Sequence, residues 1–179
     1  MKQRMIQLCL MLMYTLAAFN FVLAAPGANG STKTSASYQI HVDAGWNLLS
    51  LPLDSTGGSK NVLYPTATSP AFIYQNTYVQ KESLETGPGY WLEFDSSQTI
   101  IITGDSLLDK VIPVQAGWNM IGAKSTMLSG GFTSEPPGNI TSSYYGYKSG
   151  VGYFPADTLK GGKGFWVKAS QEGILIGGT

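Results

Sequence analysis

The sequence predicts an all-β protein built from two similar halves. Short alternating or wholly apolar runs are separated by Gly, Pro, Asn and Ser, and no window of helical length carries an apolar stripe with caps. The tetrapeptide Ala-Gly-Trp-Asn also occurs twice, starting at Ala44 and at Ala116. We expect two pseudo-symmetric repeats packed as one compact β-sandwich or barrel-like unit, with very little helix apart from a signal peptide. The best candidate for a helical turn is 59–64, which Pro65 would stop.

Residues 1–25 have the pattern of a secretory signal peptide. Lys2 and Arg4 precede an apolar run that ends in small residues before Pro26, as export and cleavage require. The alternative is an uncleaved anchor, because about 20 apolar residues can span a bilayer. The sequence therefore predicts a secreted or cell-surface protein, extracellular or periplasmic, with no membrane partner once the signal is cleaved.

The composition after the signal excludes several classes of partner. Without Lys2 and Arg4, the eleven basic residues become nine lysines against eleven acidic residues, and neither arginine nor cysteine remains. A chain with no arginine and no basic surplus lacks the charge pattern of a nucleic-acid-binding protein. The absence of cysteine excludes disulfides, which favours a bacterial exported protein over a small disulfide-stapled one.

The chain after the signal divides into a linker and two repeats. Residues 26–37 are rich in Gly, Ser and Thr and predict a flexible linker. The first repeat is assigned to 38–108 and the second to 109–179, so the two copies account for the rest of the chain.

The first shared motif opens an apolar strand in each repeat. Gly45 and Gly117 are expected to adopt the positive φ of a tight turn. Two residues later in each copy an asparagine is expected to bond neighbouring backbone groups, and the tryptophan between them is expected to supply buried apolar area. These asparagines and tryptophans are Asn47, Asn119, Trp46 and Trp118.

The second shared motif lies near the end of each repeat. "TGPGYWLEF" (86–94) matches "KGGKGFWVKA" (160–169), which places Gly89 opposite Gly164 and Trp91 opposite Trp166. Alternation places both tryptophans on faces that also carry charged residues, so we expect them to be partly exposed. Between the two motifs each repeat has an aromatic strand, a polar turn and another aromatic strand, and each repeat closes with an aliphatic strand.

These motifs resemble the "GWNLIS-P … PGKGYW" repeats found, often in tandem, in secreted and cell-surface proteins of bacteria and archaea. The matching stretches are Gly45-Trp46-Asn47-Leu48-Leu49-Ser50, Gly87-Pro88-Gly89-Tyr90-Trp91, Gly117-Trp118-Asn119-Met120-Ile121-Gly122 and Gly162-Lys163-Gly164-Phe165-Trp166. The resemblance covers essentially all of the chain after the signal. It implies an extracellular, non-catalytic β module and transfers no catalytic residue.

Catalysis is disfavoured by the residues themselves. A Ser-His-Asp triad would need His41, the only histidine, and no Gly-x-Ser-x-Gly elbow accompanies it. Asp54-Ser55-Thr56-Gly57 has one residue too many for an aspartic-protease signature. Glu93 and Asp95 would form a glycosidase pair, but their counterparts are Lys168 and Ser170. No metal-ligand or phosphate-loop pattern is present in the sequence, so no cofactor or metal is expected.

Recognition through aromatic side chains is the function that remains. We predict a non-catalytic binding or structural module whose partner is an extracellular glycan or surface protein. The candidate ligand-binding residues are Trp91, Trp166, Tyr145, Tyr147 and Tyr153, and the best candidate binding loop is 142–153. A sugar-binding module predicts that these rings form an exposed coplanar strip, whereas a secreted hydrolase predicts a groove holding two acids or His41 with a serine. The alternative to both is that the aromatic side chains fill the cores of two small β units.

Overall fold

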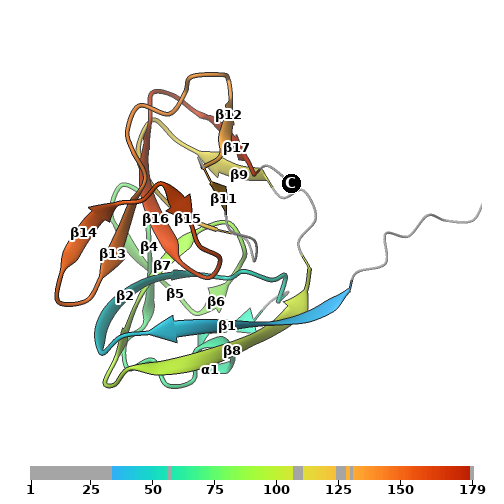
Figure 1. Ribbon diagram of the computed structural model, residues 1–179, viewed down its shortest axis with the longest axis vertical. Helices are drawn as coiled ribbons and strands as arrows, with labels where there is room; N and C mark the ends of the chain where they lie inside the picture. The colour runs from blue at the N-terminus through green and yellow to red at the C-terminus, as the bar shows by residue number, and fades with distance from the viewer. Residues whose placement is uncertain (1–33, 56–57, 107–110, 124–127, 130, 178–179) are drawn as a thin grey trace, which may run out of the picture. The chain divides into compact units, whose positions relative to one another are not determined.

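The computed structural model describes residues 34–55, 58–106, 111–123, 128–129 and 131–177, which form a set of antiparallel β-sheets (Figure 1). The predicted signal peptide and most of the linker lie outside the described residues. The strands are β1 (Ser35–Val42), β2 (Gly45–Ser50), β3 (Gly58–Ser59), β4 (Ala71–Tyr74), β5 (Tyr78–Lys81), β6 (Ser83–Leu84), β7 (Gly89–Phe94), β8 (Gln98–Asp105), β9 (Val111–Val114), β10 (Gly117–Gly122), β11 (Leu128–Ser129), β12 (Thr133–Glu135), β13 (Tyr145–Lys148), β14 (Gly152–Pro155), β15 (Thr158–Leu159), β16 (Gly164–Ala169) and β17 (Gly173–Ile176). The predicted all-β class is confirmed, and the described part contains no closed barrel.

Two four-stranded sheets have the same strand order. One follows β2-β7-β4-β5 and the other follows β10-β16-β13-β14. The register also matches: Leu48 pairs with Trp91 in the first sheet, and Met120 pairs with Trp166 in the second. This agreement in order and register is what an internal repeat predicts.

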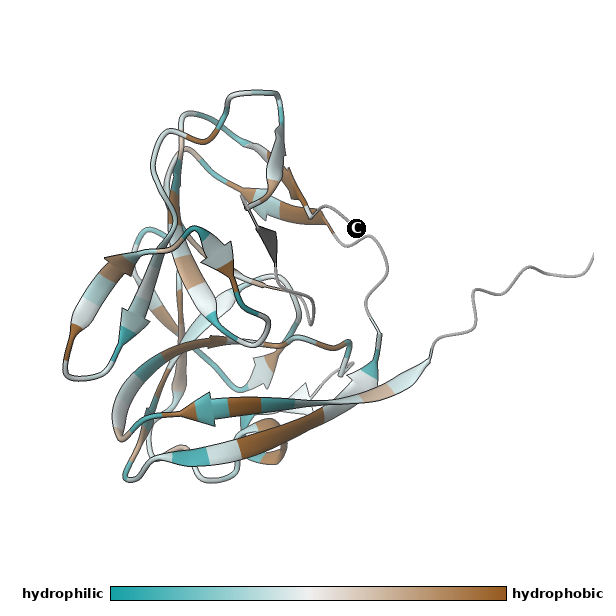
Figure 2. Ribbon diagram, viewed as in Figure 1, coloured by the Kyte–Doolittle hydropathy of each residue, from teal (hydrophilic) through white to brown (hydrophobic). Residues whose placement is uncertain are grey.

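The strands that open and close each half pair with each other. β1 pairs with β8, and β9 pairs with β17. Each pair forms within one half of the chain. β1 begins at Ser35, so three residues assigned to the linker belong to this strand. In Figure 2 β1 carries alternating polar and apolar bands, as a strand with one covered face does, whereas β8 carries a continuous apolar band formed by three consecutive isoleucines at 100–102.

The two sheets meet through backbone contacts at matching positions. The amide of Ser50 donates to the carbonyl of Gly162 (3.0 Å), and the amide of Gly122 donates to the carbonyl of Gly87 (2.7 Å). The hydroxyl of Ser50 adds a hydrogen bond to the carbonyl of Lys163 (2.9 Å). Gly164 is required by space here, since a Cβ added to it would lie 2.9 Å from the carbonyl oxygen of Leu49.

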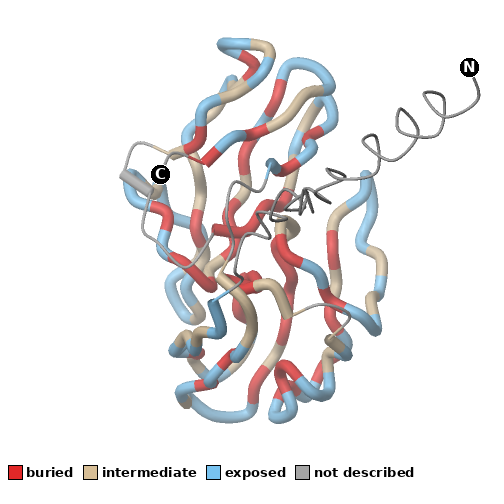
Figure 3. The backbone as a smooth tube through the Cα atoms, turned by 90° about the vertical axis from the view of Figure 1, so that its right-hand side faces the viewer, coloured by how far each residue is buried: buried red, intermediate tan, exposed pale blue. Residues whose placement is uncertain are grey.

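Burial is concentrated in two clusters that follow the two halves. The larger includes Leu49, Tyr64 and Leu92, and the smaller includes Val167 and Leu175; all five side chains are fully enclosed. Buried stretches run through the interior and exposed stretches lie along its margin (Figure 3). The second-half residue Met120 belongs to the larger cluster, so the halves share part of a core. Residues Lys33–Thr179 accordingly form one compact unit.

The short helix α1 (Lys60–Leu63) falls within the predicted turn. The Ser59 hydroxyl caps it by accepting a hydrogen bond from the amide of Asn61, and the amide of Tyr64 closes the turn on the carbonyl of Lys60. Pro65 follows immediately and ends the helix because it cannot donate the next hydrogen bond.

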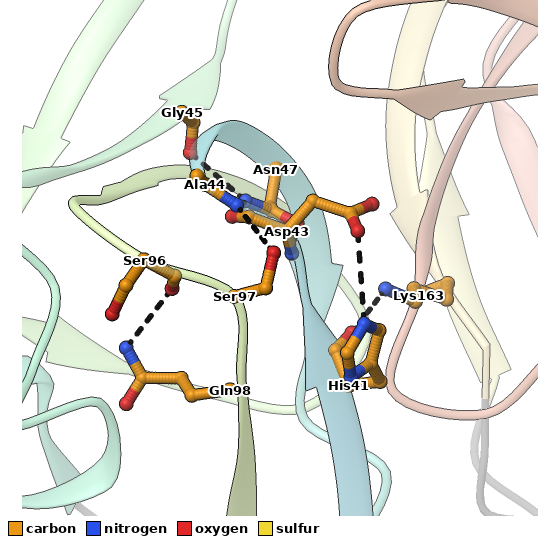
Figure 4. Close-up of polar contacts among 9 residues, drawn as sticks. All are labelled: His41, Asp43, Ala44, Gly45, Asn47, Ser96, Ser97, Gln98 and Lys163. Atoms are coloured by element: carbon orange, nitrogen blue, oxygen red, sulfur yellow. Dashed lines mark hydrogen bonds and ion pairs between the residues drawn. The ribbon is translucent and has the colours of Figure 1, made fainter.

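The Ala-Gly-Trp-Asn turns adopt the predicted geometry. Gly45 and Gly117 have φ of 86° and 96°. The Asn47 amide donates to the carbonyls of Asp43 and Gly45, and its oxygen accepts from the amide of Asp43, at 2.8 to 3.0 Å (Figure 4). Asn119 makes the same three bonds in the second half. The asparagine is thus the side chain that holds each turn closed.

Removing these side chains is expected to have unequal effects. Asn47→Ala should lower the free energy of unfolding by about 2 kcal/mol, because Asn47 is buried and its three backbone partners, partly shielded from water, would lose their hydrogen bonds. Asn119→Ala should cost about 1 kcal/mol, since Asn119 is only half-buried and water can replace its bonds. Urea denaturation of both variants measures the difference. A cost for Asn119→Ala equal to that for Asn47→Ala would contradict this interpretation.

Candidate functional site

Aromatic side chains gather on one face of each four-stranded sheet. Cross-strand partners share a face, and residues two apart on a strand share it as well. Phe72 pairs with Trp91 in one sheet, and Tyr145 pairs with Trp166 in the other. We call the combined set the aromatic site; it consists of Trp46, Phe72, Tyr74, Tyr78, Trp91, Trp118, Tyr145, Tyr147, Tyr153 and Trp166.

The aromatic site contains two adjoining pockets, and every described residue that lines them is aromatic. The first pocket has a volume of about 480 Å³ and the second about 420 Å³. The first is lined by Trp46, Phe72, Tyr78, Trp91, Tyr147 and Tyr153. The second is lined by Tyr74, Trp118, Tyr145, Tyr153 and Trp166. Tyr153 belongs to both pockets and therefore forms the wall between them.

Each half of the chain completes the pocket of the other half. The ring of Tyr147, from the second half, lies 4.7 Å from the ring of Trp91 in the first. The ring of Tyr74, from the first half, lies 5.0 Å from the ring of Trp166 in the second. These distances are ring-centroid separations typical of favourable aromatic pairs. Neither pocket is complete without side chains from both sheets.

The rings meet nearly at right angles. The interplanar angle is 83° between Trp46 and Trp91, 81° between Trp91 and Tyr147, and 86° between Trp118 and Trp166. These rings therefore do not form the coplanar strip expected of a flat polysaccharide-binding surface. They instead present ring faces from several sides to whatever occupies a pocket.

The exposure of Trp46, Trp118 and Trp91 is the reverse of the expectation, whereas Trp166 is partly exposed as expected. Trp46 and Trp118, expected in the core, are 38% and 44% exposed, whereas Trp91 is only 8% exposed and Trp166 is half-buried. Trp46 and Trp118 lie on outer strands of their sheets, near the strand start. Trp91 and Trp166 lie on inner strands and are covered by rings of the opposite half.

All five predicted ligand-binding residues belong to the aromatic site. The sequence analysis missed five others, namely Trp46, Phe72, Tyr74, Tyr78 and Trp118. The correspondence between the two sheets is a signal for three of them: Phe72 and Tyr74 occupy the positions that Tyr145 and Tyr147 occupy in the second sheet, and Tyr78 pairs with Tyr74 as Tyr153 pairs with Tyr147. All four tryptophans of the chain lie in this site.

Polar groups at the aromatic site are few. The indole Nε1 of Trp166 is buried and makes no hydrogen bond of ordinary geometry with the described residues, although the Tyr153 hydroxyl is close enough to interact with it electrostatically. Burial, with a smaller contribution from the Tyr78 hydroxyl, raises the pKa of Tyr153 above its usual value. Tyr153 is therefore neutral near pH 7, and its hydroxyl can act as a hydrogen-bond donor.

The residues weighed for catalysis are not brought together in one place, although Glu93 pairs with Trp46 at the border of the aromatic site. His41 is exposed on β1, with its Nε2 3.6 Å from the carboxylate of Asp43, and its carbonyl accepts a 2.6 Å hydrogen bond from Lys163 (Figure 4). Burial lowers the pKa of this lysine. Glu93 is half-buried at the end of β7, and Asp95 is exposed beyond that strand. Asp54 forms a backbone bridge with Asp105 at the far end of β8.

Among the described residues, no group of three or more His, Cys, Asp and Glu side chains could hold a metal ion. In the same part of the chain, no helix has the length and apolar character needed to cross a membrane. Comparison with protein-family models, with curated proteins and with solved structures found no match to this chain.

Proposed function

We propose that this protein is a non-catalytic binding module that works outside the cytoplasm and holds its ligand in the aromatic site. The observation that carries the proposal is the pair of all-aromatic pockets, each assembled from both halves of the chain. The signal-peptide pattern of residues 1–25 supports the location, and the resemblance to repeats of bacterial and archaeal surface proteins agrees with it.

The exposure of the aromatic rings supports binding over a purely structural role. Trp46 and Trp118 stay more than a third exposed, and Tyr78 and Tyr153 are more than half exposed. A β core gains little from rings that remain in water, because apolar surface stabilises a fold only when it is removed from solvent. A gathered set of exposed aromatic side chains is typical of an interaction surface.

Carbohydrate is a candidate class of ligand for the aromatic site within this proposal. The exposed faces of Trp46 and Trp118 could each stack against one sugar ring, with tyrosine hydroxyls donating to sugar oxygens. The right angles between neighbouring rings favour one sugar unit in each pocket over an extended flat polysaccharide. The tryptophans expected to stack against sugar rings are therefore Trp46 and Trp118, and not Trp91 and Trp166 as the sequence alone predicts.

The test is a glycan array together with a pull-down on polysaccharides and cell-wall material. We expect Trp46→Ala and Trp118→Ala to weaken binding by about 2 kcal/mol each, or roughly thirtyfold, as expected for a tryptophan at the centre of a binding site. Val62→Ala is the matched control, since Val62 is an exposed apolar residue on α1, outside the aromatic site. Binding that survives both tryptophan changes unaltered would overturn the proposal.

A further inference from the structure

The two pockets differ in charge at matching positions. Glu93 lies directly opposite Trp46 in the pairing of β2 with β7, and Lys168 lies directly opposite Trp118 in the pairing of β10 with β16. Directly opposed residues of an antiparallel pair share a face, so each charged side chain borders one exposed tryptophan. The first pocket therefore has an acidic border, and the second has a basic one.

The ring geometry of the first pocket suits a cation without N–H groups. Trp91 meets Trp46, Tyr147 and Tyr153 at 81° to 83°, so the negative faces of several rings border the same space. Such faces attract cations, and tryptophan attracts them most strongly. A primary ammonium would lose water without gaining hydrogen-bond acceptors here, whereas a quaternary ammonium has no N–H donors to satisfy.

Basic side chains near the first pocket point away from it. Lys81 follows Gln80 on β5, and Lys148 follows Tyr147 on β13; Gln80 and Tyr147 both lie on the aromatic face of their sheets. Because successive side chains of a strand point to opposite faces, both lysines lie on the other face. Neither lysine lines the pocket, and Glu93 also lies outside its lining, next to Trp46 in the strand pairing. The acid at its border is thus not offset by a base on the same face.

We propose that the first pocket binds a quaternary ammonium group such as the trimethylammonium of choline, and that Lys168 disfavours the same ligand in the second pocket. This proposal rests on the proposed function of the aromatic site and names a ligand class for one half of it. The cation would sit against Trp46 and Trp91, with Glu93 supplying a long-range attraction.

Choline chloride and its neutral isostere 3,3-dimethyl-1-butanol provide the direct test. The two have the same shape and differ in charge, so their comparison separates cation recognition from simple apolar burial. We expect choline to bind with a dissociation constant on the order of 1 mM and the isostere to bind at least about threefold more weakly. The readout is the set of tryptophan indole N–H signals in an NMR titration, at constant ionic strength set with sodium chloride.

The signals of Trp46 and Trp91 should move with choline before those of Trp118 and Trp166. Glu93→Gln keeps the shape and backbone contacts of the residue and should weaken choline binding about two- to fivefold. Lys168→Glu should create a second site and shift the Trp118 signal at lower choline concentration. Lys81→Gln, on the opposite face, is the control and should leave choline binding unchanged.

Three outcomes would overturn the assignment. They are equal binding of choline and its neutral isostere, choline shifts that begin at Trp118, and an absence of choline binding. If choline fails while a glycan binds in a tryptophan-dependent way, this assignment falls and the proposed function stands. If Trp46→Ala and Trp118→Ala change the binding of no ligand, both fall together.

Discussion

Replacing Leu49 with alanine is expected to lower the free energy of unfolding by about 3 to 4 kcal/mol. Leu49 is fully buried on β2, paired with Tyr90, and its backbone bridges to Lys163 of the second half. Truncation of a buried leucine loses transfer free energy and leaves a cavity, which together cost about 2 to 5 kcal/mol. The cavity would open where the two sheets meet, so relaxation of one half alone could not close it. Urea denaturation followed by tryptophan fluorescence measures the change.

The matched control is Ile101→Ala. Ile101 is an aliphatic strand residue of similar size on β8, but its side chain is 61% exposed, and the expected change is less than about 1 kcal/mol. We expect one cooperative transition in both variants because the halves share part of a core and several backbone hydrogen bonds. Two separate transitions in Leu49→Ala would show that the halves unfold independently.

Raising the pH from 10 to 12 is expected to remove several kcal/mol of stability through two buried tyrosines. Tyr64 is fully buried and donates to the carbonyl of Ser50 at 2.9 Å, and burial raises its pKa above the usual range, with a further increase from Tyr90. Burial likewise raises the pKa of Tyr90 to about 12, with opposing smaller effects from the Glu85 backbone and its charge. Both hydroxyls therefore stay protonated in the folded state well above pH 10.

The sign of the effect follows from the proton balance of the two states. Below pH 10 both tyrosines are protonated in the folded and the unfolded chain, so their contribution is full and independent of pH. Above pH 10 the unfolded chain loses these protons while the folded protein keeps them. Stability should then fall by about 1.4 kcal/mol per pH unit for each tyrosine, and the Tyr90 contribution is lost as the pH passes about 12.

Single substitutions identify the groups responsible for this alkaline loss. Tyr64→Phe should flatten the fall in stability above pH 10 by about half, although it should cost about 1 to 2 kcal/mol at pH 7 because the Ser50 carbonyl loses its donor. Tyr78→Phe is the control, since Tyr78 is exposed on β5. Urea midpoints measured from pH 7 to 12 provide the comparison. An unchanged slope in Tyr64→Phe would rule out Tyr64 as a source of the alkaline loss.

Local features of the fold were predictable because they depend on neighbouring residues only. The positive φ at Gly45 and Gly117 and the side-chain bonds of Asn47 and Asn119 arise within five residues of chain, and each was anticipated from residue type. The helical turn before Pro65 follows from the same kind of local rule. Strand alternation also predicts that Tyr90, Leu92 and Phe94 share one face, and all three side chains are buried.

The site was only partly predictable because its pockets depend on contacts between distant strands. Alternation assigns Trp91 to a face but does not say what covers that face, and the cover here is Tyr147, which is 56 positions away in the chain. The same reasoning failed for Trp46, whose position on an outer strand leaves it exposed. Composition alone selected 142–153, in which Tyr145, Tyr147 and Tyr153 lie beside the two tryptophan pairs.

The central claim is that the aromatic site binds the ligand, and the four indole N–H signals test it most directly. Every tryptophan of the chain lies in this site, so the indole region of a ¹⁵N NMR spectrum reports on nothing else. A ligand retained in the pull-down is predicted to shift the Trp46 or Trp118 signal and to saturate that shift at its binding affinity. A retained ligand that leaves all four indole signals unmoved at saturation would contradict the claim.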